Sequence, residues 1–210
     1  MSQLKDKINA DDSLKEMLNI LKITTDRNSR RRLMEYITEL LHWNRRTNLT
    51  GASSEVAFIR GPLFDALTLL PVMEPSGTFV DVGAGGGLPG IPAALLYSNI
   101  DITLVEPRPR RATFLKHICH KLSLDAEVVQ CKDSELKSGQ WHSAVAQAVW
   151  APVGWIPRGM RLVHDSGVVY VLSSTKITQE ILPPGAVVEE SFFIERPMDN
   201  ALRYAVKISK

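Results

Sequence analysis

The chain has 210 residues, of which 44% are hydrophobic and 23% charged, and this composition is typical of a globular protein with one domain of ordinary size. It excludes a disordered, collagen-like or coiled-coil chain, and no apolar run approaches the roughly 18 residues that a membrane span needs. The net charge of +2 is small, so any binding of nucleic acid has to come from a local basic patch.

Residues 1–12 are polar and charged, without the apolar region of a secretory signal. The two cysteines, Cys119 and Cys131, are too few to cross-link a fold, which is typical of a reducing compartment. Together with His117 and His120 they match no zinc-ligand spacing, so we expect no metal site. We therefore expect a cytoplasmic protein that is a monomer and does not bind membranes.

The first third of the chain has helical periodicity. A helix is predicted over residues 13–23, with Ser13 as its N-cap and Glu16 at the capping-box spacing. A second helix is predicted over 29–43 and a third over 55–70, the latter broken or delayed at Gly61-Pro62.

The rest of the chain alternates short β-rich runs with helical ones. We expect strands at 78–82, 102–105, 127–129, 143–148, 167–172, 187–194 and 203–208, with helices at 90–96 and 110–122. Such alternation predicts a parallel sheet with helices on both faces. Because no long helix separates the last two strands, we expect a hairpin there and an antiparallel strand at that edge.

The strongest functional signal is a glycine-rich turn at residues 83–87, between a buried strand and the helix that begins at Gly90. Glycines allow positive φ angles and a close approach of the backbone to a ligand. A helix N-terminus also presents free N–H groups. This arrangement at the carboxyl end of the first strand predicts a site for a nucleotide-type cofactor.

The acidic residues near the turn bear on which cofactor binds. The spacing of Gly85, Gly87 and Gly90 fits the dinucleotide fingerprint, with Glu106 near the position that contacts a ribose hydroxyl. Asp81 opposes a dinucleotide, because a carboxylate next to the turn would repel a pyrophosphate. The same carboxylate favours S-adenosylmethionine, which carries an ammonium, a sulfonium and no phosphate. A nicotinamide-dependent oxidoreductase remains an alternative, and in either case Asp133, after the third strand, can meet an adenine edge.

Several stretches around this turn resemble a known family. Residues 81–90, Asp-Val-Gly-Ala-Gly-Gly-Gly-Leu-Pro-Gly, are similar to the first motif of the bacterial ribosomal small-subunit methyltransferase G family, also called glucose-inhibited division protein B. The Leu-Pro-Gly extension is much more specific than the glycines alone. Three further similarities lie at Trp43-Asn44 with residues 48–50, at Asp65 with Leu67, and at residues 106–115.

The family methylates N7 of one guanine in 16S ribosomal RNA with S-adenosylmethionine. The resemblance therefore implies an α/β class I methyltransferase fold, with a Rossmann-like, mostly parallel seven-stranded sheet whose last strand is antiparallel. It divides the chain into an N-terminal helical extension, residues 1–74, and an S-adenosylmethionine-binding domain, residues 75–210. The implied partner is 16S ribosomal RNA in the small ribosomal subunit.

The residue pattern and the resemblance together give three sets of candidate site residues. The candidate cofactor contacts are Asp81, Gly83, Ala84, Gly85, Gly87, Leu88, Glu106, Asp133 and Ser134. The candidate RNA contacts are Arg45, Arg46, Arg110 and Arg111, with Trp43, Trp150 and Trp155 as candidate stacking surfaces. The candidate substrate-positioning residues are Asn44, Arg60, Asp65 and Gln147.

The chain departs from the family pattern at three places. Gly61 and Pro62 stand where the family usually has a basic residue and a histidine, and Ala146-Gln147-Ala148 stands where it has Ser-Arg-Ala. The run Ser173-Ser174-Thr175-Lys176 replaces a Lys-Gly pair. These changes fall on the expected RNA-facing side. A second hypothesis is therefore an RNA- or ribosome-binding protein of the same fold with altered catalysis.

Methylation at N7 of guanine requires no general base. N7 of a neutral guanine has a free lone pair and no proton to lose, so catalysis can rest on positioning and electrostatics without a general base. The lack of a recognisable Ser/His/Asp or Cys/His set agrees with this reaction. Because the major groove of A-form RNA is too narrow for side chains, the target is expected in a loop or extruded.

Overall fold

The computed structural model describes residues 9–73 and 76–210, and in them seven strands form one sheet. The strands are β1 (Gly77–Val82), β2 (Ile100–Val105), β3 (Ala126–Val129), β4 (Trp141–Ala146), β5 (Val163–Ser173), β6 (Val187–Glu195) and β7 (Leu202–Ser209). Their order across the sheet is β3-β2-β1-β4-β5-β7-β6, and β7 runs antiparallel to both of its neighbours. The prediction of a mostly parallel sheet with an antiparallel last strand is confirmed.

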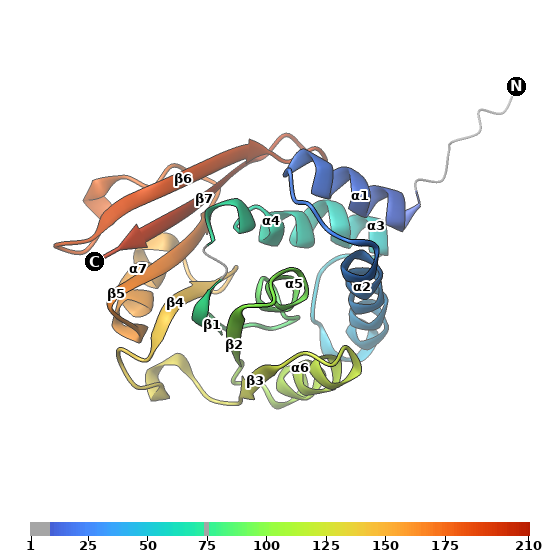
Figure 1. Ribbon diagram of the computed structural model, residues 1–210, viewed down its shortest axis with the longest axis horizontal. Coiled ribbons are helices and arrows are strands. Elements are labelled where there is room, and N and C mark those ends of the chain that lie inside the picture. The colour runs from blue at the N-terminus through green and yellow to red at the C-terminus, as the bar shows by residue number, and fades with distance from the viewer. Residues whose placement is uncertain (1–8, 74–75) are drawn as a thin grey trace, which may run out of the picture.

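Helices cover both faces of the sheet (Figure 1). They are α1 (Ala10–Ile20), α2 (Arg27–Thr47), α3 (Glu55–Phe58), α4 (Phe64–Leu67), α5 (Gly90–Leu96), α6 (Pro109–Lys121) and α7 (Pro152–Leu162). The core under α1 to α6 is continuous with one sheet face, whereas α7 packs on β4 and β5 over a second core. The helices before β1 therefore share one apolar core with the sheet.

The limits of the first two helices differ from the prediction. The helix α1 begins at Ala10 with Asn9 as its N-cap, whose side chain accepts a hydrogen bond from the Asp11 N–H. Ser13 is instead fully buried inside the helix, so its prediction as the N-cap is wrong. The helix α2 is longer than predicted at both ends, because Asp26 caps its start and Asn48, at φ 52°, ends it.

The predicted break at Gly61-Pro62 takes the form of a π-helical turn. Residues Ile59–Leu63 form this turn, η1, between α3 and α4, so the chain continues in the same direction. Proline has no N–H to donate within a helix, and a π-turn accommodates such an interruption. Single π-turns occur often at functional sites, and this one adjoins the cavity described below.

The helix α7 has no counterpart in the sequence prediction. Its interior includes Gly154, Pro157 and Gly159, which lower helix propensity, so local composition hides it. Tertiary packing compensates for this, since Trp155 is 1% exposed and its Nε1 donates a 2.9 Å hydrogen bond to the Tyr170 carbonyl. Trp155 is therefore a core residue, and its prediction as a stacking surface is wrong.

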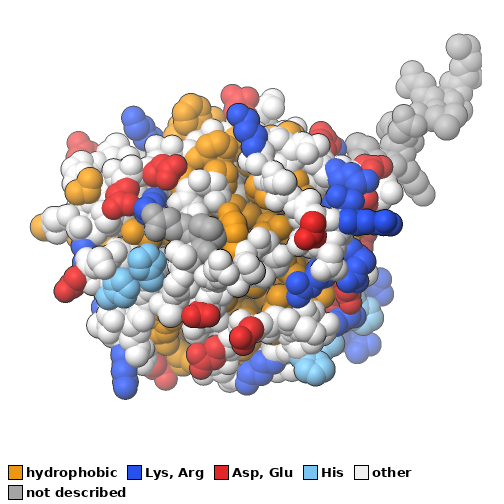
Figure 2. All heavy atoms as spheres, viewed as in Figure 1, with side chains coloured by type: hydrophobic (Ala, Val, Ile, Leu, Met, Phe, Trp, Pro, Cys, Tyr) orange, Lys and Arg blue, Asp and Glu red, His pale blue; other side chains and the backbone are white. Residues whose placement is uncertain are grey.

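The expected boundary between residues 74 and 75 and the polar start of the chain lie outside the described residues. Within residues 9–73 and 76–210, no helix has the length and apolarity to cross a membrane. Figure 2 shows Lys and Arg side chains gathered over the edge of the molecule where α1 and α2 lie.

Candidate functional site

The glycine turn lies at the carboxyl end of β1, as predicted. Gly83, Gly85 and Gly87 all have positive φ angles, of 74°, 55° and 94°. The Gly83 and Ala84 N–H groups both donate to the Val105 carbonyl, at 2.8 and 3.0 Å, which binds the turn to the end of β2. A side chain at Gly83 would lie 2.6 Å from Val149 Cγ2, so glycine is required there by both space and conformation.

Two buried carboxyl groups hold this turn. Glu106 is 3% exposed, and its Oε2 accepts the Gly85 N–H at 3.0 Å while its Oε1 accepts the Arg108 N–H at 2.8 Å. Asp81 is fully buried and its Oδ2 accepts the Gly90 N–H at 2.9 Å. Burial, together with the charge of Glu106, raises the pKa of Asp81 to about 8. Its Oδ1 is buried and has no hydrogen-bond partner.

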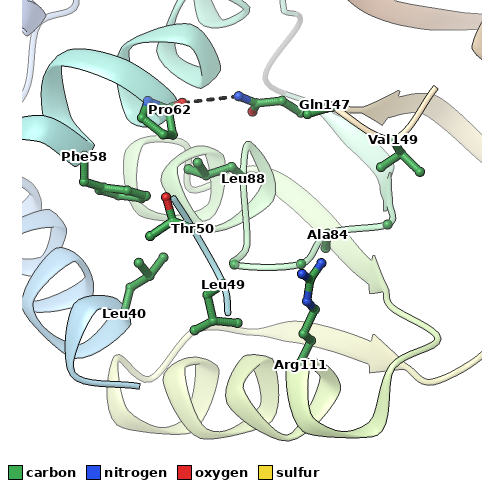
Figure 3. A pocket seen from close by; sticks show the side chains of 14 residues that line it. Leu40, Leu49, Thr50, Phe58, Pro62, Ala84, Leu88, Arg111, Gln147 and Val149 are labelled. Atoms are coloured by element: carbon green, nitrogen blue, oxygen red, sulfur yellow. Dashed lines mark hydrogen bonds between the residues drawn. The ribbon is translucent and has the colours of Figure 1, made fainter. Parts of the chain in front are cut away.

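A cavity of about 200 Å³ opens beside the turn (Figure 3). It is bounded by the glycine turn, the end of β4, the π-turn, and the segment after α2. Its lining residues are Leu40, Leu49, Thr50, Phe58, Pro62, Gly83, Ala84, Gly85, Gly86, Leu88, Arg111, Gln147, Ala148 and Val149. Four of the candidate cofactor contacts, Gly83, Ala84, Gly85 and Leu88, therefore line one cavity, whereas Asp81 and Glu106 hold the turn from behind it.

Asn44 builds one wall of this cavity without lining it. Its Oδ1 accepts the N–H groups of Leu49 and Thr50, at 2.7 and 2.9 Å, and its Nδ2 donates to the Thr50 carbonyl at 2.9 Å. These three hydrogen bonds fix the turn after α2, where Asn48 adopts the left-handed conformation. Leu49 and Thr50 thereby face the glycine turn, which gives the Asn44 motif a clear structural reason.

Two departures from the family pattern meet in the opposite wall. Gln147, at the end of β4, donates its Nε2–H to the Pro62 carbonyl of the π-turn at 3.2 Å. Because a carbonyl oxygen only accepts hydrogen bonds, this contact fixes the orientation of the amide. Gln147 Oε1 is buried without a partner. Figure 3 shows this hydrogen bond bridging the cavity wall.

Several other predicted residues lie outside this cavity. Arg60 pairs with Glu16 of α1, and Asp65 pairs with Arg196 at 3.0 Å and Arg203 at 2.8 Å. Asp133 lies in the 3-10 turn η3 (Asp133–Glu135), 3.4 Å from Arg158. Ser134 is exposed beside it, and both follow β3 at the same edge of the sheet.

The third departure also lies at that edge, where β5 ends. Ser173 Oγ accepts the Thr175 N–H at 3.1 Å, which closes a local turn. Neither Ser173 nor Thr175 lines the cavity. The departure from Lys-Gly therefore changes a neighbouring loop and leaves the cavity walls as described.

The predicted arginines divide between two places. Arg111 lines the cavity, and its Nη2 donates to the Asn48 carbonyl at 2.8 Å. Arg46 and Arg110 line shallow grooves beside it, between the end of α2 and the start of α6. Arg45 is exposed on the last turn of α2. Within the described residues, Arg45, Arg46 and Arg110 form no ion pair, so their charges are available to an anionic partner.

Sequence reasoning missed three residues at the site. Tyr36 donates its hydroxyl proton to the Gly86 carbonyl at 2.7 Å, Phe58 lines the cavity, and Val149 covers Gly83. Tyr36 and Phe58 lie in apolar helical stripes, where periodicity indicates only core packing. Their partners are far away in sequence, so no local signal distinguishes them from other buried aromatic residues.

Comparisons with known proteins agree with this geometry. The family model of rRNA small subunit methyltransferase G matches residues 29–193. The ribosomal RNA small subunit methyltransferase G of Neisseria gonorrhoeae is 33% identical over 182 residues, covering 85% of this chain and 88% of the relative. The protein of that name from Anaeromyxobacter dehalogenans is 27% identical over 201 residues, covering 91% and 94%.

Solved structures with low sequence identity support the fold alone. TrmN from Thermus thermophilus superposes with a TM-score of 0.57 at 14% identity, over 80% of this chain and 53% of that chain. The M. jannaschii TYW2 structure in complex with AdoMet gives 0.53 at 11% identity, over 70% and 75%. The family model and the relatives match most of the length of this chain, and the glycine turn and strand order are consistent with that match. The chain therefore belongs to the rRNA small subunit methyltransferase G family.

Proposed function

We propose that this protein transfers the methyl group of S-adenosylmethionine to N7 of a guanine in the 16S RNA of the small ribosomal subunit. The observation that carries the proposal is the cavity at the glycine turn in a chain that belongs to the rRNA small subunit methyltransferase G family. Because the proposed substrate is ribosomal RNA, we propose that the protein works in the cytoplasm. We also propose that it is a monomer. Family membership disfavours the nicotinamide-dependent alternative.

The residues at the turn fit S-adenosylmethionine. Asp81 Oδ1 is buried without a partner, and we propose that the ligand ammonium ionises this carboxyl group and pairs with it. Both oxygens of Glu106 accept one N–H each and retain a lone pair for the ribose hydroxyls. Asp133 and Ser134, one strand further along the same edge, are proposed to meet the adenine. When bound, S-adenosylmethionine supplies an electrophilic methyl group on its sulfonium.

The lining of the cavity favours N7 over an amino group as the methyl acceptor. Arg111 is the only charged residue among the described residues that line it, and none of them is Asp, Glu, His, Cys or Lys. A guanine amino group would have to lose a proton during methylation, and this lining offers no base for that step. N7 needs none, so the chain's residues have only to exclude water and hold the base in line with the methyl group.

Arginines beside the cavity are proposed to hold the RNA backbone. Arg46 and Arg110 line adjoining grooves, Arg45 is one residue along α2, and Arg111 reaches the cavity itself. Each unpaired arginine that contacts a phosphate contributes about one unit to the salt dependence of RNA binding. We therefore expect an Arg46→Ala/Arg110→Ala variant to bind subunits more weakly and with a shallower salt slope.

Methyl transfer to isolated subunits tests the proposal. Small ribosomal subunits from a strain that lacks this modification are incubated with the protein and radiolabelled S-adenosylmethionine, and N7-methylguanine is located by strand cleavage at the modified base. The Gly85→Asp variant is the inactive control, because its side chain would intrude on Glu106 and the cofactor. Label in 16S RNA at N7 is the expected result.

Two other outcomes would redirect the proposal. Subunit binding without methyl transfer would favour the alternative of an RNA-binding protein that has lost catalysis, which the departures at Pro62 and Gln147 motivate. Binding of NAD in place of S-adenosylmethionine, measured by calorimetry with both ligands, would refute the methyltransferase assignment of the site.

A further inference from the structure

We propose that Tyr36 is a positioning residue of the cofactor site, which holds the glycine turn in its binding conformation through the Gly86 carbonyl. The inference rests on the proposed function, since it concerns how S-adenosylmethionine is bound. It also assigns the helix α2, which precedes the sheet in sequence, to the cofactor site itself.

The contact is short, buried and remote in sequence. Tyr36 is fully buried, and its hydroxyl donates to the carbonyl oxygen of Gly86 at 2.7 Å. Its ring packs edge-on against Phe58, which lines the cavity, with 6.2 Å between the ring centroids. Burial, followed by the charge of Asp81, raises the pKa of Tyr36 well above 10, so the hydroxyl stays protonated and keeps donating.

The other anchors hold only the sheet side of the turn. Gly83 and Ala84 bind the end of β2, and Gly85 binds Glu106. Gly86 lies on the opposite side, where a side chain would meet Leu40 Cδ1 at 3.1 Å and the Leu49 carbonyl at 3.4 Å. The helix α2 and the segment after it thus approach Gly86 closely. Tyr36, in α2, donates the hydrogen bond that joins this helix to Gly86.

Gly86 also carries a free donor. It lines the cavity, and its N–H makes no hydrogen bond within the described residues. A free N–H in a residue that lines the cavity suits the carboxylate of an amino-acid moiety, such as the methionine part of S-adenosylmethionine. The direction of this N–H depends on the backbone of Gly86, which glycine leaves free to rotate. The hydrogen bond from Tyr36 holds the peptide unit that follows Gly86, and so restricts rotation at Gly86 before the ligand arrives.

The chain offers a matched pair of variants. Tyr36→Phe removes one hydroxyl that donates to a buried carbonyl beside the cavity. Tyr97→Phe removes a hydroxyl that donates to the Leu70 carbonyl at 3.1 Å, and neither Tyr97 nor Leu70 lines the cavity. Both substitutions cost one tyrosine–carbonyl hydrogen bond, so both test stability, whereas only the first tests the site.

The experiment measures S-adenosylmethionine affinity by calorimetry and methyl transfer to unmodified subunits, for wild type and both variants, with thermal melting for each. We expect Tyr36→Phe to raise Kd and KM for S-adenosylmethionine roughly 3- to 10-fold, the range of one net hydrogen bond. The kcat at saturating cofactor should change less than about 2-fold, and Tyr97→Phe should leave all three constants unchanged.

Two results would overturn the inference. Wild-type affinity in Tyr36→Phe would show that the turn does not need this contact, and an equal loss of affinity in both variants would assign the effect to general destabilisation. Both results leave the proposed function intact. If the wild type itself fails to bind S-adenosylmethionine, the proposed function fails and this inference fails with it.

Discussion

The buried carboxyl group of Asp81 should make the stability of the protein depend on pH. Its pKa of about 8 lies far above the 3.8 of an exposed aspartic acid, because burial disfavours the charged form and Glu106 adds a negative charge nearby. Between these two values the folded protein keeps the proton while the unfolded chain has lost it. Stability is therefore lost as the pH rises from about 4 to about 8, at a rate of up to about 1.4 kcal/mol per pH unit.

The substitution Asp81→Asn removes this titration and keeps the shape of the side chain. The amide oxygen can still accept the Gly90 N–H, whose present distance to Asp81 Oδ2 is 2.9 Å. Over the full window the wild type loses at most about 6 kcal/mol relative to the variant, a large part of the stability of a domain of this size. Ionisable groups remote from Asp81 contribute equally in both proteins, so their contribution cancels in the difference.

Urea unfolding of both proteins at pH 5, 6, 7 and 8 measures that difference. We expect the free energy of unfolding of the variant, minus that of wild type, to increase with each rise in pH. A difference that stays constant within about 0.3 kcal/mol across the series would refute the reasoning, because it would mean that Asp81 is ionised throughout. S-adenosylmethionine should ionise Asp81 on binding, so calorimetry at pH 7 in buffers of different ionisation enthalpy should detect proton release in wild type only.

Two further substitutions test the packing around the site. Gly87→Ala would place a methyl group against Ile91 at a residue with φ 94°, so we expect a loss of about 1–3 kcal/mol in thermal unfolding together with loss of S-adenosylmethionine binding. Asp65→Asn would leave the mostly buried Arg203 without a carboxylate and Arg196 with Asp199 alone, and should cost about 2–3 kcal/mol in urea unfolding. Unchanged unfolding curves would contradict each expectation.

The sheet was predictable from the sequence because its signals are local. Each strand is a short apolar run bounded by turn residues, and the pattern of helices between strands determines that they run parallel. The glycine turn was predictable for the same reason, since residues 81–90 are contiguous. The helix α7 was missed because its prolines and glycines lower its propensity, while the packing of Trp155 that stabilises it is tertiary.

The candidate site was only partly predictable, because its walls come from distant segments. Asn44 was singled out from a motif, but its task of shaping residues 49 and 50 depends on a turn that only the structure shows. Asp65 was a candidate for positioning substrate, and its carboxylate is held by two arginines 131 and 138 residues later. A sequence motif can therefore single out such residues, but their contacts with distant segments are known only from the structure.

The contact between Gln147 and Pro62 bears on whether the protein is an active enzyme. Considered separately, these two departures suggest a damaged target site. In the structure Gln147 donates one hydrogen bond at 3.2 Å to the backbone carbonyl of Pro62, which joins the end of β4 to the π-turn. Glu106 holds the glycine turn, and Asn44 holds the segment after α2. Gln147 Oε1 stays buried without a partner, so this contact compensates the departures only in part. Because the altered wall lies beside a glycine turn whose hydrogen bonds are in place, methyl transfer to isolated subunits is the measurement that separates the methyltransferase from the RNA-binding protein without catalysis.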